Sequence, residues 1–214
     1  MQRRAFTRTL ATVGAVSVAS FGSLPLLSHA QANLKEGSDY MRLDKQAPVD
    51  AAAGQIEVLE FFAYTCGHCF NFEPMLKDWV KQKPAHVVLR RMPVGFNPSM
   101  EPLQRLYFAL EVLGKVEDLH DKVFQSIHVE RQRLVTAESM VEWAVKQGLD
   151  KTKFSEAFNS FGVVNKAKRA TQLQNAYQVE ATPSLGIAGR FLVPGQGART
   201  LVVANALIAQ TPKA

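Results

Sequence analysis

The feature that most constrains the fold is a pair of cysteines placed between an apolar run and a helical pattern. The chain has two cysteines among its 214 residues, Cys66 and Cys69. Residues 55–62 form a short, almost continuous apolar run, which is typical of a strand buried on both faces of a sheet. After the cysteines, apolar residues recur at helical spacing until Pro84. The sequence therefore predicts a strand, a tight turn and a helix, with both cysteines at the helix start.

In the rest of the chain the residue pattern changes from strand to helix and back to strand. Residues 86–92 predict another strand, and strand patterns return only at 184–188 and 191–193, before a last helix over 200–209. Between these strands the apolar spacing predicts five helices, over residues 100–113, 116–127, 137–147, 152–159 and 163–177. The early strand–helix–strand order favours a parallel pair, and the late hairpin, with Gly189-Arg190 as its turn, favours an antiparallel pair.

These patterns together predict an α/β fold in which a mixed sheet carries an inserted all-helical domain. The sheet domain is then discontinuous, formed by residues 33–97 and 179–214. The helical insertion spans residues 98–178. A short edge strand is expected near residues 40–43.

The N-terminus has the pattern of a secretory signal. Residues 1–9 are basic, residues 10–27 are apolar and small, and Ala30 and Ala32 supply small residues where a signal peptidase cuts. We therefore expect residues 1–32 to be a signal peptide, cleaved near Ala30 or Ala32. Their Gly, Ser, Thr and Pro content argues against a permanent membrane span. An Arg-Arg pair near the start leaves Sec and twin-arginine export both open.

The charge of the chain argues against a nucleic-acid partner. The formal net charge is +6, but removal of residues 1–32 leaves 22 Lys and Arg against 19 Asp and Glu. A surplus this small does not favour nucleic acid. The densest remaining basic cluster, within residues 166–169, is typical of a solvated helix face.

Export also constrains what the cysteines do. An exported domain that relies on disulfides for stability carries more of them, and a bridge between Cys66 and Cys69 closes too small a loop to remove much unfolded-state entropy. At a helix start, Cys66 meets unpaired N–H groups and the positive end of the helix dipole, which favour the nucleophilic thiolate. We therefore expect Cys66 to exchange disulfides and Cys69, one turn deeper, to resolve them. His68 can stabilise the thiolate further.

The residues around the pair argue against two other uses of a Cys-x-x-Cys sequence. A zinc site needs four ligands, and the sequence has neither a second cysteine pair nor histidines at ligand spacing. A c-type haem needs histidine directly after the second cysteine, where this chain has Phe70. A passive structural disulfide stays an alternative. The sequence predicts no metal and no organic cofactor.

Several short sequences resemble a known family. Residues 61–69, Phe-Phe-Ala-Tyr-Thr-Cys-Gly-His-Cys, followed by Pro74, are similar to the active-site turn of the thioredoxin superfamily. Residues 181–184, Ala-Thr-Pro-Ser, resemble its cis-proline segment. The order of elements and the export signal resemble the DsbA family of periplasmic dithiol oxidases, which implies a thioredoxin-like mixed sheet. Gly67 departs from the best-known DsbA type, which has proline there, and Gly-His is the dipeptide of protein disulfide isomerases.

The resemblance implies roles for residues beside the cysteines. It implies a cis peptide bond before Pro183 and a segment at Thr182 that receives an extended substrate, together with Gly67. An ordinary trans proline at the start of a strand is the alternative. Tyr64 and Phe70 flank the pair, so they form either an apolar rim for unfolded chains or part of the core.

Glu60 is the remaining candidate. Its neighbours two residues away on either side are apolar, so the strand period places a carboxylate in an apolar row. A charge there is costly unless it is paired or protonated. The matching family position implies a buried acid that relays protons for Cys69, and a solvated glutamate at an edge is the alternative.

The residues and the resemblance predict an exported thiol:disulfide oxidoreductase of the periplasm, which introduces disulfides into newly translocated proteins. The implied partners are unfolded, cysteine-containing proteins and a DsbB-type membrane protein that reoxidises the pair, with a monomer as the expected state. A disulfide reductase or isomerase is the near alternative. A non-enzymatic thioredoxin-fold binding protein or holdase is the alternative from another class.

Overall fold

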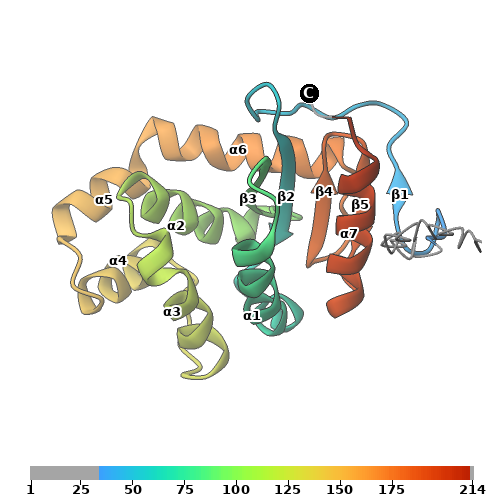
Figure 1. Cartoon of the computed structure of the whole chain (residues 1–214). Helices are drawn as coiled ribbons and strands as arrows, with labels where there is room; N and C mark the ends of the chain where they lie inside the picture. The colour runs from blue at the N-terminus through green and yellow to red at the C-terminus, as the bar shows by residue number, and fades with distance from the viewer. Residues whose placement is uncertain (1–33, 213–214) are drawn as a thin grey trace, which may run out of the picture. The chain divides into compact units, whose positions relative to one another are not determined.

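The computed structural model of the protein describes residues 34–212. Its centre is a mixed sheet with the strand order β1-β5-β4-β2-β3 (Figure 1). The strands are β1 (Met41–Arg42), β2 (Ile56–Phe62), β3 (Val87–Pro93), β4 (Ser184–Ile187) and β5 (Phe191–Pro194). β2 pairs in parallel with β3 and antiparallel with β4, which confirms the mixed sheet. The expected edge strand is β1, which pairs antiparallel with β5.

Helices account for most of the other described residues. They are α1 (Gly67–Gln82), α2 (Glu101–Val112), α3 (Val116–His128), α4 (Ala137–Lys146), α5 (Lys151–Asn159), α6 (Phe161–Ala176) and α7 (Ala198–Gln210), with a 3-10 turn at Pro98–Met100. Helices α2 to α6 lie between β3 and β4 along the chain, which confirms the helical insertion. None of the helices described is long and apolar enough to cross a membrane.

The described residues all belong to one compact unit, so a division into two domains at residues 98 and 178 stays an interpretation of the sequence. The predicted signal peptide, residues 1–32, lies outside the described residues.

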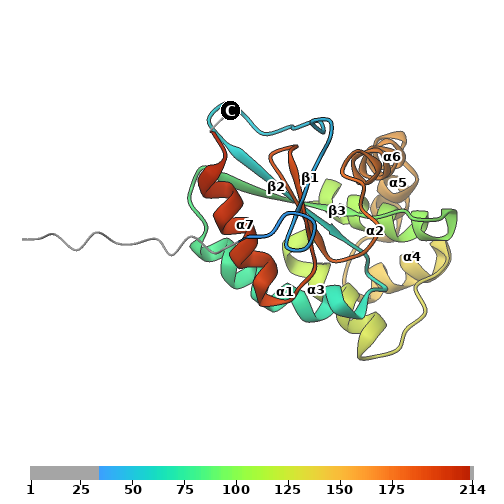
Figure 2. The same ribbon diagram turned by 90° about the vertical axis from the view of Figure 1, so that its right-hand side faces the viewer.

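The sheet separates two hydrophobic cores. Successive residues of a strand point to opposite faces, and all seven residues of β2 are buried. On one face, Ile56 and Val58 pack with residues of α1 and α7, among them Leu76 and Leu207. The core of the helical block includes Phe61, whose ring lies 5.3 Å from that of Tyr177, and Figure 2 shows α1 and α7 together on one side of the strands. β2 is thus an interior strand of the sheet, and its end is held from both faces.

The late hairpin turns one residue earlier than predicted. Ala188 leaves the strand and takes a positive φ of 52°, followed by Gly189 at 70°. The N–H of Arg190 donates to the carbonyl of Ile187 at 2.9 Å and closes the turn. Glycine is required at position 189 because a side chain there would collide with the backbone carbonyl of Ala47. Two consecutive positive φ values match the right-handed twist of the strands, which a turn centred on Gly189-Arg190 would not provide.

Candidate active site

The two cysteines lie where β2 gives way to α1, as the sequence predicts. Cys66 is the N-cap of α1, with extended backbone angles, and its Sγ accepts the backbone N–H of Cys69 at 3.2 Å. This contact satisfies one of the N–H groups that a helix start leaves unpaired. Both residues are free thiols, Cys66 half-buried and Cys69 fully buried. The outer sulfur is therefore the one that a substrate can reach.

The surroundings of the two sulfurs favour opposite protonation states. The hydrogen bond from the Cys69 thiol is the largest of the effects that lower the pKa of Cys66, to about 5, against the opposing effect of burial. The backbone N–H groups of Cys69 and His68 lower this pKa further. The same contact with Cys66, and then burial, raise the pKa of the Cys69 thiol. At neutral pH the site therefore holds a Cys66 thiolate beside a Cys69 thiol.

The proline segment lies against the outer cysteine. The Thr182–Pro183 peptide bond is cis, as the resemblance implied. The Sγ of Cys66 lies 3.4 Å from the carbonyl oxygen of Thr182, across a sequence separation of 116 residues. Pro183 is buried directly before β4, whereas Thr182 is partly exposed. The pairing of β4 with β2 thus brings Thr182 to the cysteines, and its partial exposure leaves room beside it.

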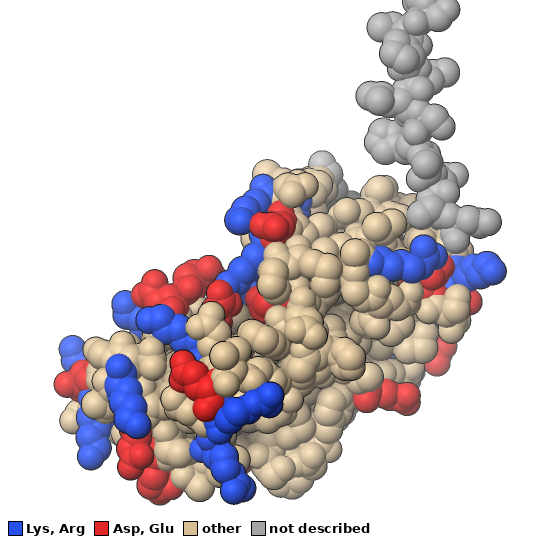
Figure 3. All heavy atoms as spheres, turned by 90° about the horizontal axis from the view of Figure 1, so that it is seen from below, with Lys and Arg blue, Asp and Glu red and all other residues tan. Residues whose placement is uncertain are grey.

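Gly67 and His68 occupy the first turn of α1, and both are exposed. An exposed imidazole beside the half-buried Cys66 is placed as the sequence analysis expected, and its electrostatic effect on the thiolate stays a prediction. Figure 3 shows one face of the molecule, on which Lys and Arg are interspersed with Asp and Glu. The charge on that face forms no extended patch of one sign.

Glu60 is fully buried, which removes the alternative of a solvated edge glutamate. It lies opposite Arg91 in the register of β2 and β3, and its Oε2 is 3.0 Å from the Nε of Arg91. Burial raises the pKa of Glu60 well above its usual range, and the nearby carboxylate of Glu73 raises it further, while Arg91 acts in the opposite direction. The surroundings of Glu60 therefore favour its protonated form.

The partners of Glu60 are not predicted by the sequence. Glu73 of α1 binds the Nη2 of Arg91 through Oε2 at 3.1 Å, and its Oε1 is 3.0 Å from the Nε2 of His120 in α3. Burial opposes ionisation of Glu73, but the hydrogen bond to His120 and the charge of Arg91 outweigh it and hold its pKa at about 2. One signal was available, because Glu73 follows Cys69 by four residues and so lies one turn below it on the buried side of α1.

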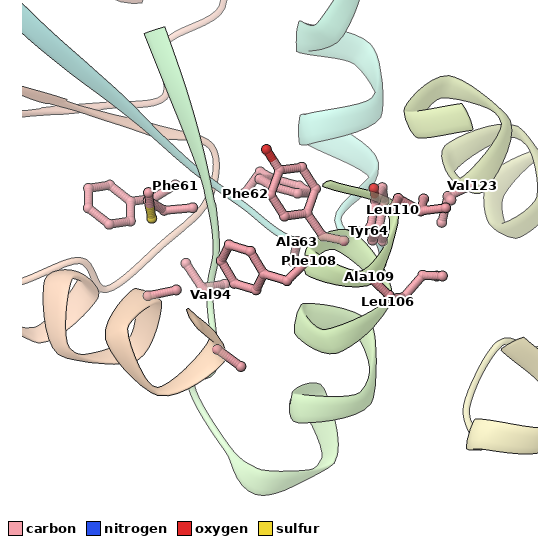
Figure 4. Packing of buried hydrophobic residues seen from close by; sticks show 14 of the residues in the cluster. Phe61, Phe62, Ala63, Tyr64, Val94, Leu106, Phe108, Ala109, Leu110 and Val123 are labelled. Carbon is pink, nitrogen blue, oxygen red and sulfur yellow. The ribbon is translucent and has the colours of Figure 1, made fainter. Parts of the chain in front are cut away.

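The two aromatic residues flanking the cysteines have different environments. Tyr64 is buried, with 1% of its surface exposed, so the prediction that it forms part of a substrate-binding rim is wrong and the core alternative holds. Its ring packs edge-on against the rings of Phe62 and Phe124, with centroids 5.1 and 5.0 Å apart, and Figure 4 shows it within the buried hydrophobic cluster. Its hydroxyl can be buried with the ring because it finds a partner in the Nδ1 of His120 at 2.8 Å.

Phe70 is half-buried and remains a candidate for an apolar rim. Its ring stacks on that of His128, with centroids 5.2 Å apart and an interplanar angle of 12°. The Nε2 of His128 is also 2.8 Å from the carbonyl oxygen of Tyr64. His128, the last residue of α3, therefore contacts the chain both before the cysteine turn, at Tyr64, and after it, at Phe70.

Comparisons with known proteins agree with this geometry. The sequence profile of the DSBA-like thioredoxin domain matches residues 57–204. The chain is 41% identical to the thiol:disulfide interchange protein DsbA of Bordetella parapertussis over all of both chains. It is 36% identical to the protein of the same name from Pseudomonas aeruginosa PAO1, over 72% of this chain and 73% of the other. A crystal structure of Pseudomonas aeruginosa DsbA superimposes with a TM-score of 0.78 at 34% identity, covering 83% of this chain and 94% of that one.

Proposed function

Since the chain belongs to the DSBA-like thioredoxin domain family and is a thiol:disulfide oxidoreductase, we propose that it works as an exported dithiol oxidase. The observation that carries the direction of the reaction is the contrast between the two sulfurs. A pKa of about 5 at Cys66 stabilises the reduced protein as a thiolate, which makes its disulfide more oxidising. The pair therefore gives its disulfide to substrates.

The reaction proceeds by two exchanges. A substrate thiolate attacks the Sγ of Cys66, a mixed disulfide forms, and the bond between Cys66 and Cys69 breaks with Cys69 as the leaving thiolate. A second substrate thiolate then attacks the substrate sulfur of the mixed disulfide, and Cys66 leaves as a thiolate. The substrate loses two electrons and gains one disulfide, and the pair Cys66–Cys69 gains the same two electrons.

The leaving Cys69 needs a proton, because its thiolate is disfavoured in the buried position. We assign this proton to Glu60, a buried acid whose pKa is raised by burial and by the nearby Glu73. Proton transfer leaves a transient carboxylate at Glu60, which the guanidinium of Arg91, 3.0 Å away, stabilises until a proton from water restores the acid. When the pair is reoxidised, Glu60 first releases its proton to water, and its carboxylate then accepts the proton of the Cys69 thiol as Cys69 attacks the Sγ of Cys66.

The substrate binds beside Cys66 in this proposal. The partly exposed Thr182 segment offers backbone groups to an extended chain, and Gly67 keeps the approach to Cys66 open. The rim is formed by Phe70 together with His68. The partners are unfolded exported proteins and a DsbB-type membrane protein that reoxidises the site, and the location is the periplasm, reached after cleavage near Ala30 or Ala32.

The test uses a reduced, unfolded peptide with two cysteines and the preoxidised protein. We expect one peptide disulfide to form per protein disulfide consumed, and no disulfide with Cys66→Ser. A Cys69→Ser variant should accumulate a mixed disulfide with the peptide when Cys66 is preactivated, because the resolving thiol is missing. A holdase would instead suppress aggregation equally well in Cys66→Ser and wild type. A reductase or isomerase would leave the peptide reduced or only reshuffle existing disulfides.

A further inference from the structure

A buried histidine of the helical block joins the cysteine turn to the acids beneath it. His120 of α3 is 3% exposed. Its Nδ1 lies 2.8 Å from the hydroxyl of Tyr64, two residues before Cys66, and its Nε2 lies 3.0 Å from the Oε1 of Glu73, four residues after Cys69. Neither contact is used in the exchange chemistry described above. A polar side chain placed this deep, with both nitrogens engaged, calls for a functional account.

The partners fix the protons of the imidazole. Glu73 is ionised, so its Oε1 only accepts, and the proton between it and His120 must be on Nε2. Burial lowers the pKa of His120, against the raising effect of Glu73, so the ring is neutral and its Nδ1 accepts from the Tyr64 hydroxyl. Glu73 thus receives one hydrogen bond from His120 at Oε1 and one from Arg91 at Oε2.

Glu60 has no comparable donors. Both of its carboxylate oxygens are buried without a well-aligned hydrogen bond, although the Nε of Arg91 lies 3.0 Å from one of them. Two carboxyl groups that share a buried site with one guanidinium do not both ionise, and the one that receives the donors takes the negative charge. The proton therefore belongs on the other.

We propose that His120 is a positioning residue that decides which buried acid carries the proton: by donating its Nε2–H to Glu73, it keeps Glu73 ionised and leaves the proton on Glu60. This inference deepens the proposed function and rests on it, because Glu60 is there the proton donor for Cys69. It adds a residue of the helical insertion to the machinery of the sheet. The protonation pattern itself can be measured without any assay of disulfide transfer.

Other charged groups around His120 do not reverse this pattern. The groups facing it are Tyr64 of the turn, Glu73 and Lys77 of α1, Arg91 of β3, Tyr107 of α2, and Glu117 and Asp121 of α3 itself. Glu73 and Asp121 favour a protonated ring, whereas Arg91 and burial oppose it, and burial has the largest effect. Asp121 is engaged by Lys77, which reduces its influence on His120.

The test is a carboxyl-carbon NMR titration of the reduced protein labelled at glutamate, with Glu73 assigned by the loss of its signal in Glu73→Gln. His120→Gln keeps an N–H donor near the place of Nε2, whereas His120→Asn, one carbon shorter, does not reach Glu73. We expect the Glu73 midpoint to rise by about one to two pH units in His120→Asn, the equivalent of one charge-assisted hydrogen bond, and to return towards the wild-type value in His120→Gln. Tyr64→Phe, which removes only the contact at Nδ1, should leave the midpoint unchanged.

Disulfide transfer supplies a second readout. We expect the rate at pH 7 to fall about tenfold in His120→Asn, less than the hundredfold or more that a positioned proton donor itself contributes, because His120 acts through Glu60; the thiolate titration of Cys66 should be unchanged. An unchanged Glu73 midpoint in His120→Asn overturns the inference, and so does an equal rise in both amide variants. If the midpoint shifts as expected but the wild-type protein fails to oxidise the peptide, the proton assignment stands and the proposed oxidase function is wrong.

Discussion

The low pKa of Cys66 makes the stability of the reduced protein depend on pH, and this dependence can be calculated. In the folded protein this pKa is about 5, against an ordinary value of 9.0. Between these values the folded state has lost a proton that the unfolded chain still holds, so the free energy of unfolding rises with pH. The contribution is present above pH 9 and is lost as the pH falls through 5.

The magnitude follows from the interval between pH 5 and pH 7. Each pH unit contributes about 1.4 kcal/mol, so two units give about 2.7 kcal/mol for a fully shielded group. Cys66 is only half-buried, and solvent screening reduces this figure to roughly 1.5 kcal/mol. A value of this size is a substantial fraction of the stability of a typical domain.

The assay is urea unfolding of the reduced protein at pH 5 and pH 7, followed by the fluorescence of the buried Trp79 and Trp143. Cys66→Ser is the reference, because every other group contributes to both proteins. We expect the stability advantage of wild type over Cys66→Ser to grow by about 1.5 kcal/mol from pH 5 to pH 7. Cys69→Ser keeps a donor for the Cys66 thiolate and should retain most of the dependence. If the free energies of unfolding of wild type and Cys66→Ser change equally between pH 5 and pH 7, the assignment of a thiolate to Cys66 is refuted.

Three further predictions concern the acids and the rim. Glu60→Gln should slow disulfide transfer while the fold survives, and unchanged transfer kinetics would remove Glu60 from the mechanism. The free energy of unfolding of this variant, relative to wild type, should rise from pH 5 to pH 8, because the raised pKa of Glu60 costs the folded wild-type protein stability as the pH increases. Glu73→Gln should lower the free energy of unfolding by about 3 kcal/mol at pH 7, because it leaves Arg91 with less counter-charge. This loss should vanish as the pH falls from 4.5 to 2, and urea unfolding over that pH range would measure it. Phe70→Ala should raise the KM for an unfolded peptide with little change in kcat, and equal changes in both would contradict a role in the rim.

The local parts of the fold and of the site could be predicted from the sequence. The apolar run of β2, the helical spacing of α1 and the placement of Cys66 at the helix start depend on neighbours within a few residues. The cis bond before Pro183 came from a resemblance, since nothing in the spacing alone distinguishes it from a trans bond.

The parts that depend on long-range packing could not be predicted. His120 is 47 residues from Glu73 and 56 from Tyr64, and no periodic pattern relates residues so far apart. Arg91 follows Arg90 in an edge strand, and only the register with β2 shows that one of the two arginines meets Glu60. Tyr64 is adjacent to the site in sequence yet turns into the core, because a buried histidine supplies the partner for its hydroxyl.

The most direct test of the account is the redox equilibrium of Cys66 and Cys69 in a series of glutathione buffers at pH 7, with the thiolate of Cys66 titrated by absorbance in parallel. We expect a potential well above the glutathione poise, together with an acidic Cys66. A potential as low as that of thioredoxin, with a near-neutral thiol at Cys66, would contradict it and would make the protein a reductant of disulfides.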